Sequence, residues 1–155
     1  MKTCFFLGHR NEGMDILPSL KQAVEQHIVT YDIAHFWVGH YGRFNALAAQ
    51  TVLQAKQRHP WVTLSLLLPY LPTKQPGPVP EGFDQILFPP SLDLIPSDMG
   101  ILRTNCYGID SCTHLIARVG RPTGALTLLS YALAREARGF LHVTELPAPK
   151  PRFLA

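Results

Sequence analysis

Three short apolar runs, residues 3–7, 33–38 and 114–119, each stop at a glycine, and a segment with helical spacing follows each of them. A continuous apolar run of this length is typical of a strand that is buried on both faces of a parallel sheet. Strands that alternate with helices indicate a sheet whose two faces are covered by those helices. This repeated order of strand, glycine turn and helix predicts an α/β fold.

The remaining elements follow from helical spacing, capping residues and β-branched apolar runs. Asp15 is a suitable N-cap for the first helix, and so is Ser97, with Asp98 in the first turn, for the third. Gly139 is placed to end the last helix as its C′ residue. These signals predict helices over residues 15–30, 43–58, 97–107 and 125–138, and strands over 61–68 and 140–143. We therefore predict a single Rossmann-like α/β domain over residues 1–146, with a mostly parallel sheet of about five strands and helices on both faces.

Residues 69–90 interrupt this alternation. Prolines recur through the segment together with Gly77 and Gly82, which excludes a regular helix or a central strand, although a short strand over 86–88 is compatible with the sequence. A loop of this length in a small domain is either a functional flap or a surface insertion, and both interpretations stay open. The proline-rich tail, 147–155, is expected to fray.

Composition restricts the functional classes. The 155 residues are 46% hydrophobic and 16% charged, as expected of one globular domain. A net charge of +3 suits a small anionic ligand but is too weak to indicate tight nucleic-acid binding. The cysteines and histidines show no metal-ligand spacing, so we expect no metal site. No apolar run approaches the ~20 residues that span a membrane, and we expect a cytoplasmic protein without a membrane partner.

The glycine turns are the candidate binding sites. Ligands of parallel α/β sheets bind beyond the carboxyl ends of the strands, where turns lead into helices. Three turns lie at that edge: 8–10, 39–42 and 120–124. Glycine lets the backbone approach a ligand, and the free N–H groups of the following helix favour a phosphate. We therefore expect the three turns to surround one anionic ligand.

The first and last turns carry side chains that suit this chemistry. Two residues after Gly8, Arg10 carries a guanidinium that matches two phosphate oxygens, although an exposed ion pair with Glu12 or Asp15 is an equally good interpretation. His9 is either a hydrogen-bonded structural residue or a catalyst. In the last turn, Thr123 and Gly124 stand at the start of a helix, and N-capping alone would explain Thr123.

The second turn gives the clearest phosphate signal. A strand ends at Val38, the turn Gly39-His40-Tyr41-Gly42 follows, and a helix opens at once. Arg43 would add a charge-assisted contact, and Asn45 could hydrogen-bond a sugar hydroxyl or a base. The alternative is a tight turn with close helix packing.

The same residues carry a family resemblance. Residues 3–10 resemble the opening CFFTGHR signature of YpsA-like, DUF1273-type proteins of the SLOG superfamily. Residues 39–45 resemble the second turn of that family, 56–70 its segment that ends in Leu-Pro-Tyr, and 124–132 its last glycine-led helix. Arg103, Asn105 and Asp110 resemble the region before its fourth strand, which adds Arg103 to the ligand-binding candidates. The resemblance thus covers almost the whole chain.

This resemblance implies a Rossmann-like fold and one of several activities. The superfamily also contains the cytokinin-activating phosphoribohydrolases and the DNA-processing protein DprA, so activity does not follow from membership. The chain departs from these relatives at Asn45, where the pattern has an aspartate, and in residues 120–127, which keep only fragments of the phosphoribohydrolase motif and no acid. Asp110 is the remaining carboxylate that could assist N-glycosidic cleavage, with a turn residue as the alternative interpretation.

Three hypotheses follow. The first is a binding or sensor module for a nucleotide or an ADP-ribose-like molecule, without any certain cofactor. The second is a nucleoside-monophosphate N-glycosidase in which Asp110 assists. The third is a single-stranded DNA binder, in which aromatic residues such as Tyr41 stack on bases. Related folds often dimerise, so a homo-oligomer is a further hypothesis about partners.

Overall fold

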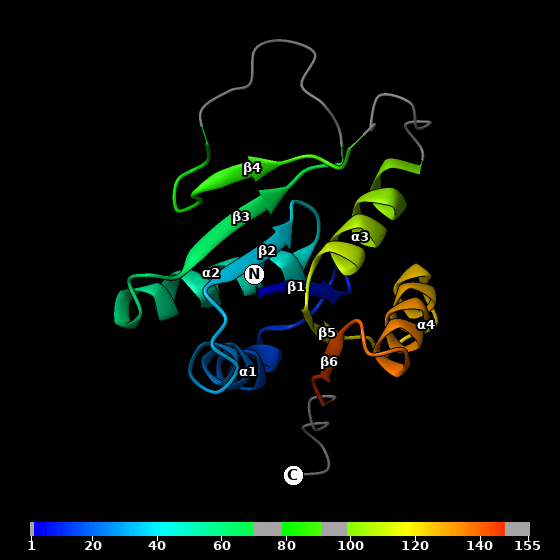
Figure 1. Ribbon diagram of the computed structural model, residues 1–155, viewed down its shortest axis with the longest axis horizontal. Helices are drawn as coiled ribbons and strands as arrows, with labels where there is room; N and C mark the ends of the chain where they lie inside the picture. The colour runs from blue at the N-terminus through cyan, green and yellow to red at the C-terminus, as the bar shows by residue number, and fades with distance from the viewer. Residues whose placement is uncertain (1, 70–78, 91–98, 148–155) are drawn as a thin grey trace.

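The computed structural model describes residues 2–69, 79–90 and 99–147, and every statement below refers to these residues. The chain forms one sheet of six parallel strands in the order β4-β3-β2-β1-β5-β6 (Figure 1). The strands are β1 (Thr3–Gly8), β2 (His35–Gly39), β3 (Thr63–Leu67), β4 (Gln85–Leu87), β5 (His114–Arg118) and β6 (His142–Glu145). This confirms the predicted α/β fold with a parallel sheet, with six strands instead of about five.

Four helices cover the two faces of the sheet. They are α1 (Leu17–Val29), α2 (Arg43–Arg58), α3 (Gly100–Ser111) and α4 (Gly124–Ala137). One core cluster joins α1 and α2 to one face of the sheet, and a second joins α3 and α4 to the other (Figure 1). Among the described residues, none of the helices combines the length and the apolar character needed to span a membrane.

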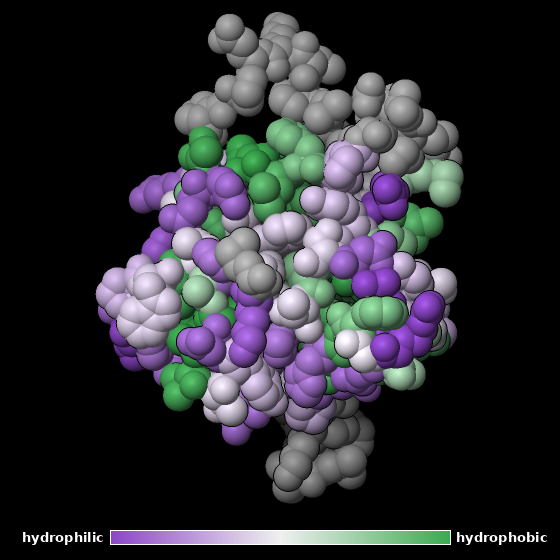
Figure 2. Space-filling model, in the orientation of Figure 1, coloured by the Kyte–Doolittle hydropathy of each residue, from purple (hydrophilic) through white to green (hydrophobic). Residues whose placement is uncertain are grey.

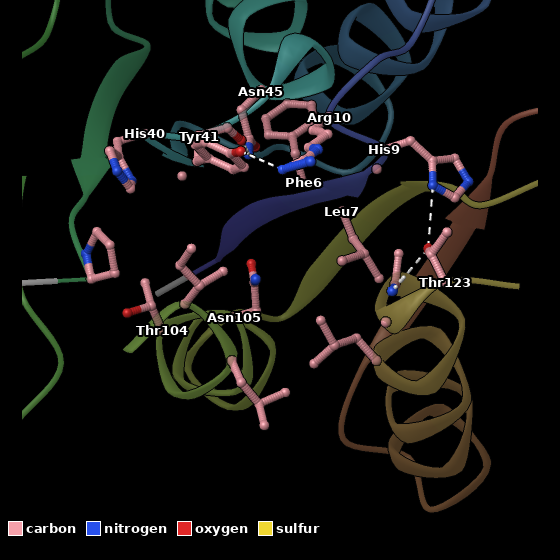
Figure 3. A pocket seen from close by; sticks show the side chains of 18 of the residues that line it. Phe6, Leu7, His9, Arg10, His40, Tyr41, Asn45, Thr104, Asn105 and Thr123 are labelled. Carbon is pink, nitrogen blue, oxygen red and sulfur yellow. Dashed lines mark hydrogen bonds between the residues drawn. The ribbon is translucent and has the colours of Figure 1, made fainter. Parts of the chain in front are cut away.

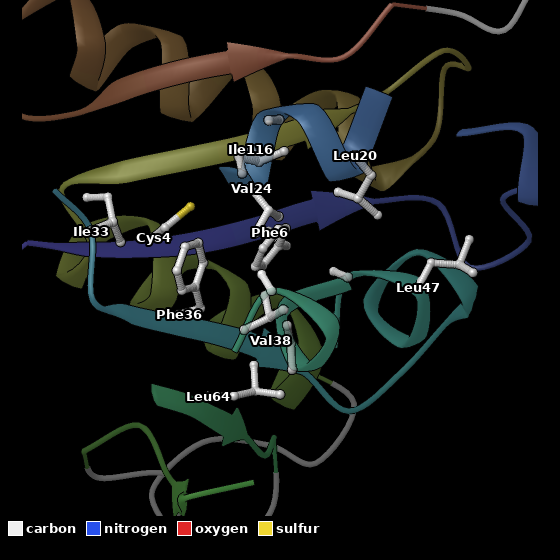
Figure 4. Packing of buried hydrophobic residues seen from close by; sticks show 14 of the residues in the cluster. Cys4, Phe6, Leu20, Val24, Ile33, Phe36, Val38, Leu47, Leu64 and Ile116 are labelled. Carbon is white, nitrogen blue, oxygen red and sulfur yellow. The ribbon is translucent and has the colours of Figure 1, made fainter. Parts of the chain in front are cut away.

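β1 lies in the middle of the sheet and is buried on both faces. Cys4 and Phe6 belong to the α1/α2 core (Figure 4), while Phe5 and Leu7 belong to the α3/α4 core. This alternation follows from the two-residue period of a strand, and burial on both faces explains why the run shows no regular polar positions. The ring of Phe6 stacks on Phe36 of β2, with 6.1 Å between their centroids.

The order of the strands reverses next to β1. The chain proceeds from β1 through β2 and β3 to the edge strand β4, then returns to place β5 on the other side of β1. Ligands of open α/β sheets bind at the carboxyl ends of the strands beside such a reversal. The turns after β1 and β5 are therefore neighbours at the edge where a ligand is expected.

The edge strand β4 lies inside the proline-rich segment. It pairs with β3 over Gln85–Leu87, close to the short strand that the sequence allowed. Figure 2 shows green hydrophobic side chains gathered over β4 beside α3. Trp37 and Leu87 are only partly buried where they pack against the α3/α4 core. Residues 70–78, which belong to the same predicted loop, and the tail beyond residue 147 lie outside the described residues.

The predicted N-cap of the first helix was wrong. A 3₁₀ turn over Met14–Ile16 precedes α1, so Asp15 lies inside this turn and makes no capping hydrogen bond. Pro18 at the second helical position supplies the fixed backbone angle that starts α1 without a side-chain cap. The candidate caps Ser97 and Asp98 of the third helix lie outside the described residues.

Further boundaries also differ from the prediction, and β2 and β3 each begin two residues later than expected. α3 continues to Ser111 instead of ending near Tyr107, since Gly108 packs against the ring of Phe5, and a Cβ there would lie 2.6 Å from a ring carbon. Gly139, with φ +80°, ends α4 as its C′ residue, as predicted. β6 begins only at His142, two residues later than expected.

Candidate functional site

A cavity of about 470 Å³ lies at the carboxyl edge of the sheet, between the turns after β1, β2 and β5 and the helices α3 and α4 (Figure 3). Most of its lining comes from residues directly after strands or in the first turns of α3 and α4. The lining residues are Phe6, Leu7, Gly8, His9, Arg10, Asn11, Gly39, His40, Tyr41, Asn45, Leu67, Pro69, Ile101, Leu102, Thr104, Asn105, Arg121, Thr123, Gly124, Ala125 and Leu128.

The structure brings most of the predicted site residues together in this cavity. Those that line it are Gly8, His9, Arg10, Gly39, His40, Asn45, Thr123 and Gly124. Those that do not are Gly42, Arg43, Arg103 and Asp110. The three glycine turns therefore converge as expected, although they are far apart in the sequence.

His9 connects the first turn to the last. Its Nε2 accepts a hydrogen bond from the backbone N–H of Gly120 at 2.9 Å, so Nδ1 carries the proton and faces Thr123 Oγ1 at 3.4 Å. Burial lowers the pKa of His9, and the charges of Arg121 and Arg118 lower it further. A neutral, buried and doubly engaged imidazole matches the structural interpretation of this residue.

Arg10 lies against the aromatic ring of the second turn. Its Nη1 donates to Tyr41 Oη at 2.6 Å, and its guanidinium carbon lies 5.7 Å from the centroid of the tyrosine ring. Among the described residues, Arg10 forms no ion pair with Glu12 or Asp15, the partners that the alternative interpretation named. Its charge is thus held at the cavity by an aromatic partner instead of being neutralised by a carboxylate.

The second turn packs against the first, and backbone N–H groups that follow it donate to carbonyl oxygens of the first turn. Gly42 has φ +97°, and a Cβ there would lie 2.8 Å from the Cα of Arg10. The N–H of Arg43 donates to the carbonyl oxygen of Arg10 at 2.7 Å, and that of Phe44 donates to His9 at 3.3 Å. These two amides at the start of α2, which the sequence suggested for phosphate, are therefore already bonded. The tight-turn interpretation accounts for Gly42.

Asn45 also serves this turn. Its Nδ2 donates to the carbonyl oxygen of Tyr41 at 2.7 Å. Its Oδ1 is buried and has no partner among the described residues. A side chain at Gly39 would press on this amide, because a Cβ there would lie 3.1 Å from Asn45 Nδ2. The amide thus holds the turn, although Asn45 lines the cavity.

The N-terminus of α4 is the more open anion site. Thr123 caps this helix by accepting from the N–H of Ala125 at 3.2 Å. A Cβ at Gly124 would meet no atom within 4 Å, so nothing in the described structure fills the space beside the first residue of the helix. Arg121 stands in the same turn and hydrogen-bonds Asn11 from the first turn. The N–H groups of Ala125 and Leu126 are bonded to Thr123, so the amide of Gly124 and the guanidinium of Arg121 are the groups that favour a phosphate at this position.

The charged side chains in the described lining of the cavity are cationic. Arg10 and Arg121 line it, and no carboxylate does so in the part of the chain that the structure describes. Asp110 lies outside the lining, where it accepts from the hydroxyl of Tyr131 and pairs with Arg135 at 3.3 Å. Residues 2–69, 79–90 and 99–147 contain no cluster of histidine, cysteine or carboxylate side chains that could hold a metal ion.

Sequence reasoning missed the wall that α3 contributes. Ile101, Leu102, Thr104 and Asn105 line the cavity, although the sequence has no glycine in residues 83–99, before this helix. Arg121 lies within the predicted turn 120–124, and Asn11 directly follows the predicted turn 8–10, so the sequence pattern already indicated their region. The residues on α3 gave no comparable signal beyond the family resemblance of Asn105.

Comparison with known proteins adds no identification. The sequence matches no protein-family model, and it matches no curated protein. The resemblance to YpsA-like proteins therefore stays a prediction that depends on the motifs in residues 3–10 and 39–45.

Proposed function

We propose that this protein binds a nucleotide, or a nucleotide-derived molecule with a phosphate, in the cavity at the carboxyl edge of its sheet. The observation that carries the proposal is the convergence of Arg10, Arg121 and the N-terminus of α4 on one cavity, without a carboxylate in its described lining. A guanidinium in the turn before a helix N-terminus, with a second guanidinium in the lining of the same cavity, favours a multiply charged anion over a neutral ligand.

Size and surface fit the same class of ligand. A volume of about 470 Å³ lies within the ~300–1,000 Å³ typical of small-molecule pockets. Apolar side chains from β1, β3, α3 and α4 line much of it, including Leu7, Leu67, Ile101 and Leu128. A nucleotide has a charged end and a flat, weakly polar end, which correspond to these two parts of the cavity.

Thermal unfolding of the full chain tests the proposal. We would compare AMP, ribose 5-phosphate, inorganic phosphate and adenosine as ligands. A ligand at a hundred times its dissociation constant adds about 2.7 kcal/mol to the free energy of unfolding. We expect AMP to stabilise the protein strongly, ribose 5-phosphate less and adenosine least, because the phosphate supplies the charge that Arg10 and Arg121 recognise.

Arginine variants locate the site. Arg121→Gln and Arg10→Ala should each remove most of the stabilisation by AMP. Arg138→Ala is the matched control, since Arg138 lies beyond the end of α4 against Phe140, outside the cavity lining. No stabilisation by any phosphate-bearing probe, or the same loss in the control as in the two variants, would contradict the proposal. Assay of the AMP sample for released adenine would show whether binding is followed by hydrolysis.

A further inference from the structure

Asn105 presents an unpaired amide to the cavity. Its side chain points from α3 into the cavity, toward the side on which Tyr41 and Arg10 lie (Figure 3). It makes no hydrogen bond to the described residues, and neither its nitrogen nor its oxygen is shut off from the cavity, in contrast to the oxygen of Asn45. An amide in this position is available to a ligand as one donor group and one acceptor side by side.

The surroundings of Asn105 on this wall are apolar. Ile101 precedes it by one helical turn, and Leu7 and Leu128 line the same cavity. The hydroxyl of its neighbour Thr104 is already used, because it donates to the carbonyl oxygen of Gly100 at 2.7 Å. A few polar groups among apolar side chains fix the orientation of a ligand, and here the α3 wall supplies one amide for that purpose.

The charged side chains of the cavity lie away from α3, so the uncharged part of a ligand would face this helix. Thr123 is the N-cap of α4, and Arg121 lines the cavity two residues before it. Arg10 lies across the cavity from Asn105 (Figure 3). A nucleotide whose phosphate lies at the start of α4 would therefore turn its base toward α3. The polar edge of that base would meet Asn105, and its flat faces would meet the apolar side chains.

We propose that Asn105 is a specificity-determining residue that recognises the edge of a purine on which a donor stands beside an acceptor, as the exocyclic amine of adenine stands beside a ring nitrogen. The inference rests on the proposed function and names the base that the site prefers. An asparagine amide forms two parallel hydrogen bonds with such an edge. Adenine has few other polar groups, so it leaves little unpaired against Ile101 and Leu128.

The test compares two nucleotides that differ in one group. AMP carries the exocyclic amine, and purine riboside 5′-monophosphate has a hydrogen in its place. We expect the wild-type protein to bind AMP at least about tenfold more tightly by calorimetric titration. In Asn105→Leu this preference should fall to within about twofold, because the variant has no amide to recognise the amine, while the affinity for ribose 5-phosphate stays unchanged.

Two further proteins make the outcome decisive. Asn105→Asp keeps the acceptor that faces the exocyclic amine but loses the donor to the ring nitrogen, so both nucleotides should bind more weakly while the preference for AMP remains. Gln54→Leu replaces an exposed amide on α2, outside the cavity lining, and should keep it. Equal binding of the two nucleotides by the wild type, or an unchanged preference in Asn105→Leu, overturns the role of Asn105 while phosphate binding stands. If ribose 5-phosphate and AMP both fail to bind the wild type, the proposed function fails with it.

Discussion

His9 Nε2 accepts a hydrogen bond from the backbone N–H of Gly120 at 2.9 Å, although 111 residues separate the two in sequence. The bond joins the turn after β1 to the turn after β5, which lie at the reversal of strand order. The same imidazole faces Thr123, the N-cap of α4. One buried side chain thus fixes the position of the helix N-terminus relative to Arg10.

Replacement of His9 should weaken both the fold and the site. In His9→Ala the N–H of Gly120 loses its acceptor, and we expect the free energy of unfolding to fall by roughly 1–3 kcal/mol. AMP should also bind more weakly, because the turn that carries Arg121 is no longer held. Urea unfolding and calorimetric titration measure the two effects. Unchanged stability in this variant would show that the bond contributes nothing to the fold.

A second histidine, His27 on α1, should make stability depend on pH. It is fully buried, its Nδ1 lies 2.7 Å from the carbonyl oxygen of Ala23, and its Nε2 has no partner among the described residues. The rings of Tyr31 and His114 face it, His142 and Lys2 add to the local charge, and burial lowers the pKa of His27 to about 4.

The sign follows from proton uptake on unfolding. Between pH 6.5 and about 4 the unfolded chain protonates His27 while the folded one does not, so stability falls as the pH decreases through this range. The contribution of this group is roughly 3 kcal/mol, because its pKa falls from 6.5 to about 4 on folding. His27→Leu should flatten the dependence by up to this amount, measured by urea unfolding at about pH 4.5 and 7.5. An equally steep dependence in the variant would assign it to the other histidines.

Tyr41 should act through Arg10. Removal of its hydroxyl in Tyr41→Phe breaks the 2.6 Å hydrogen bond and leaves the guanidinium less constrained. We expect the affinity for AMP to fall roughly two- to tenfold, which corresponds to one hydrogen bond, with little change in thermal stability because Tyr41 is exposed. Tyr131→Phe removes a hydroxyl outside the cavity, the one bonded to Asp110, and is the control. Equal affinities for AMP in all three proteins would exclude this role of Tyr41.

The sequence predicted the fold and the convergence of the three glycine turns. It did not predict the hydrogen bonds between these turns. Apolar runs that end in glycine reflect burial on both faces of a sheet, so the order of strands and helices could be predicted from them. The amides of Arg43 and Phe44 were expected to be free, but the carbonyl oxygens of Arg10 and His9 bind them. Such contacts join distant turns and leave no local pattern. The same reason hid the orientation of Asn105, because its position at the cavity depends on how α3 packs on the sheet, where Gly108 lies against Phe5.

Two glycines of the cavity should respond in opposite ways to alanine. Gly8 ends β1 against Phe44, and a Cβ there would lie 2.2 Å from a ring carbon of Phe44. Because that ring is buried between β1 and α2, it cannot move aside without loss of packing. Gly8→Ala should therefore lower the free energy of unfolding by about 1–3 kcal/mol or more.

Gly124→Ala should instead keep or raise stability, by up to about 1 kcal/mol, since Gly124 is helical, has a negative φ, and a Cβ there meets no atom within 4 Å. The added methyl group would occupy space beside the first turn of α4, where the proposal places the phosphate, so affinity for AMP should fall at least about tenfold. Thermal unfolding with and without AMP separates the two effects. If Gly124→Ala binds AMP as tightly as the wild type does, the phosphate does not lie at the start of α4, because the added methyl group would then stand in its place without any effect on affinity.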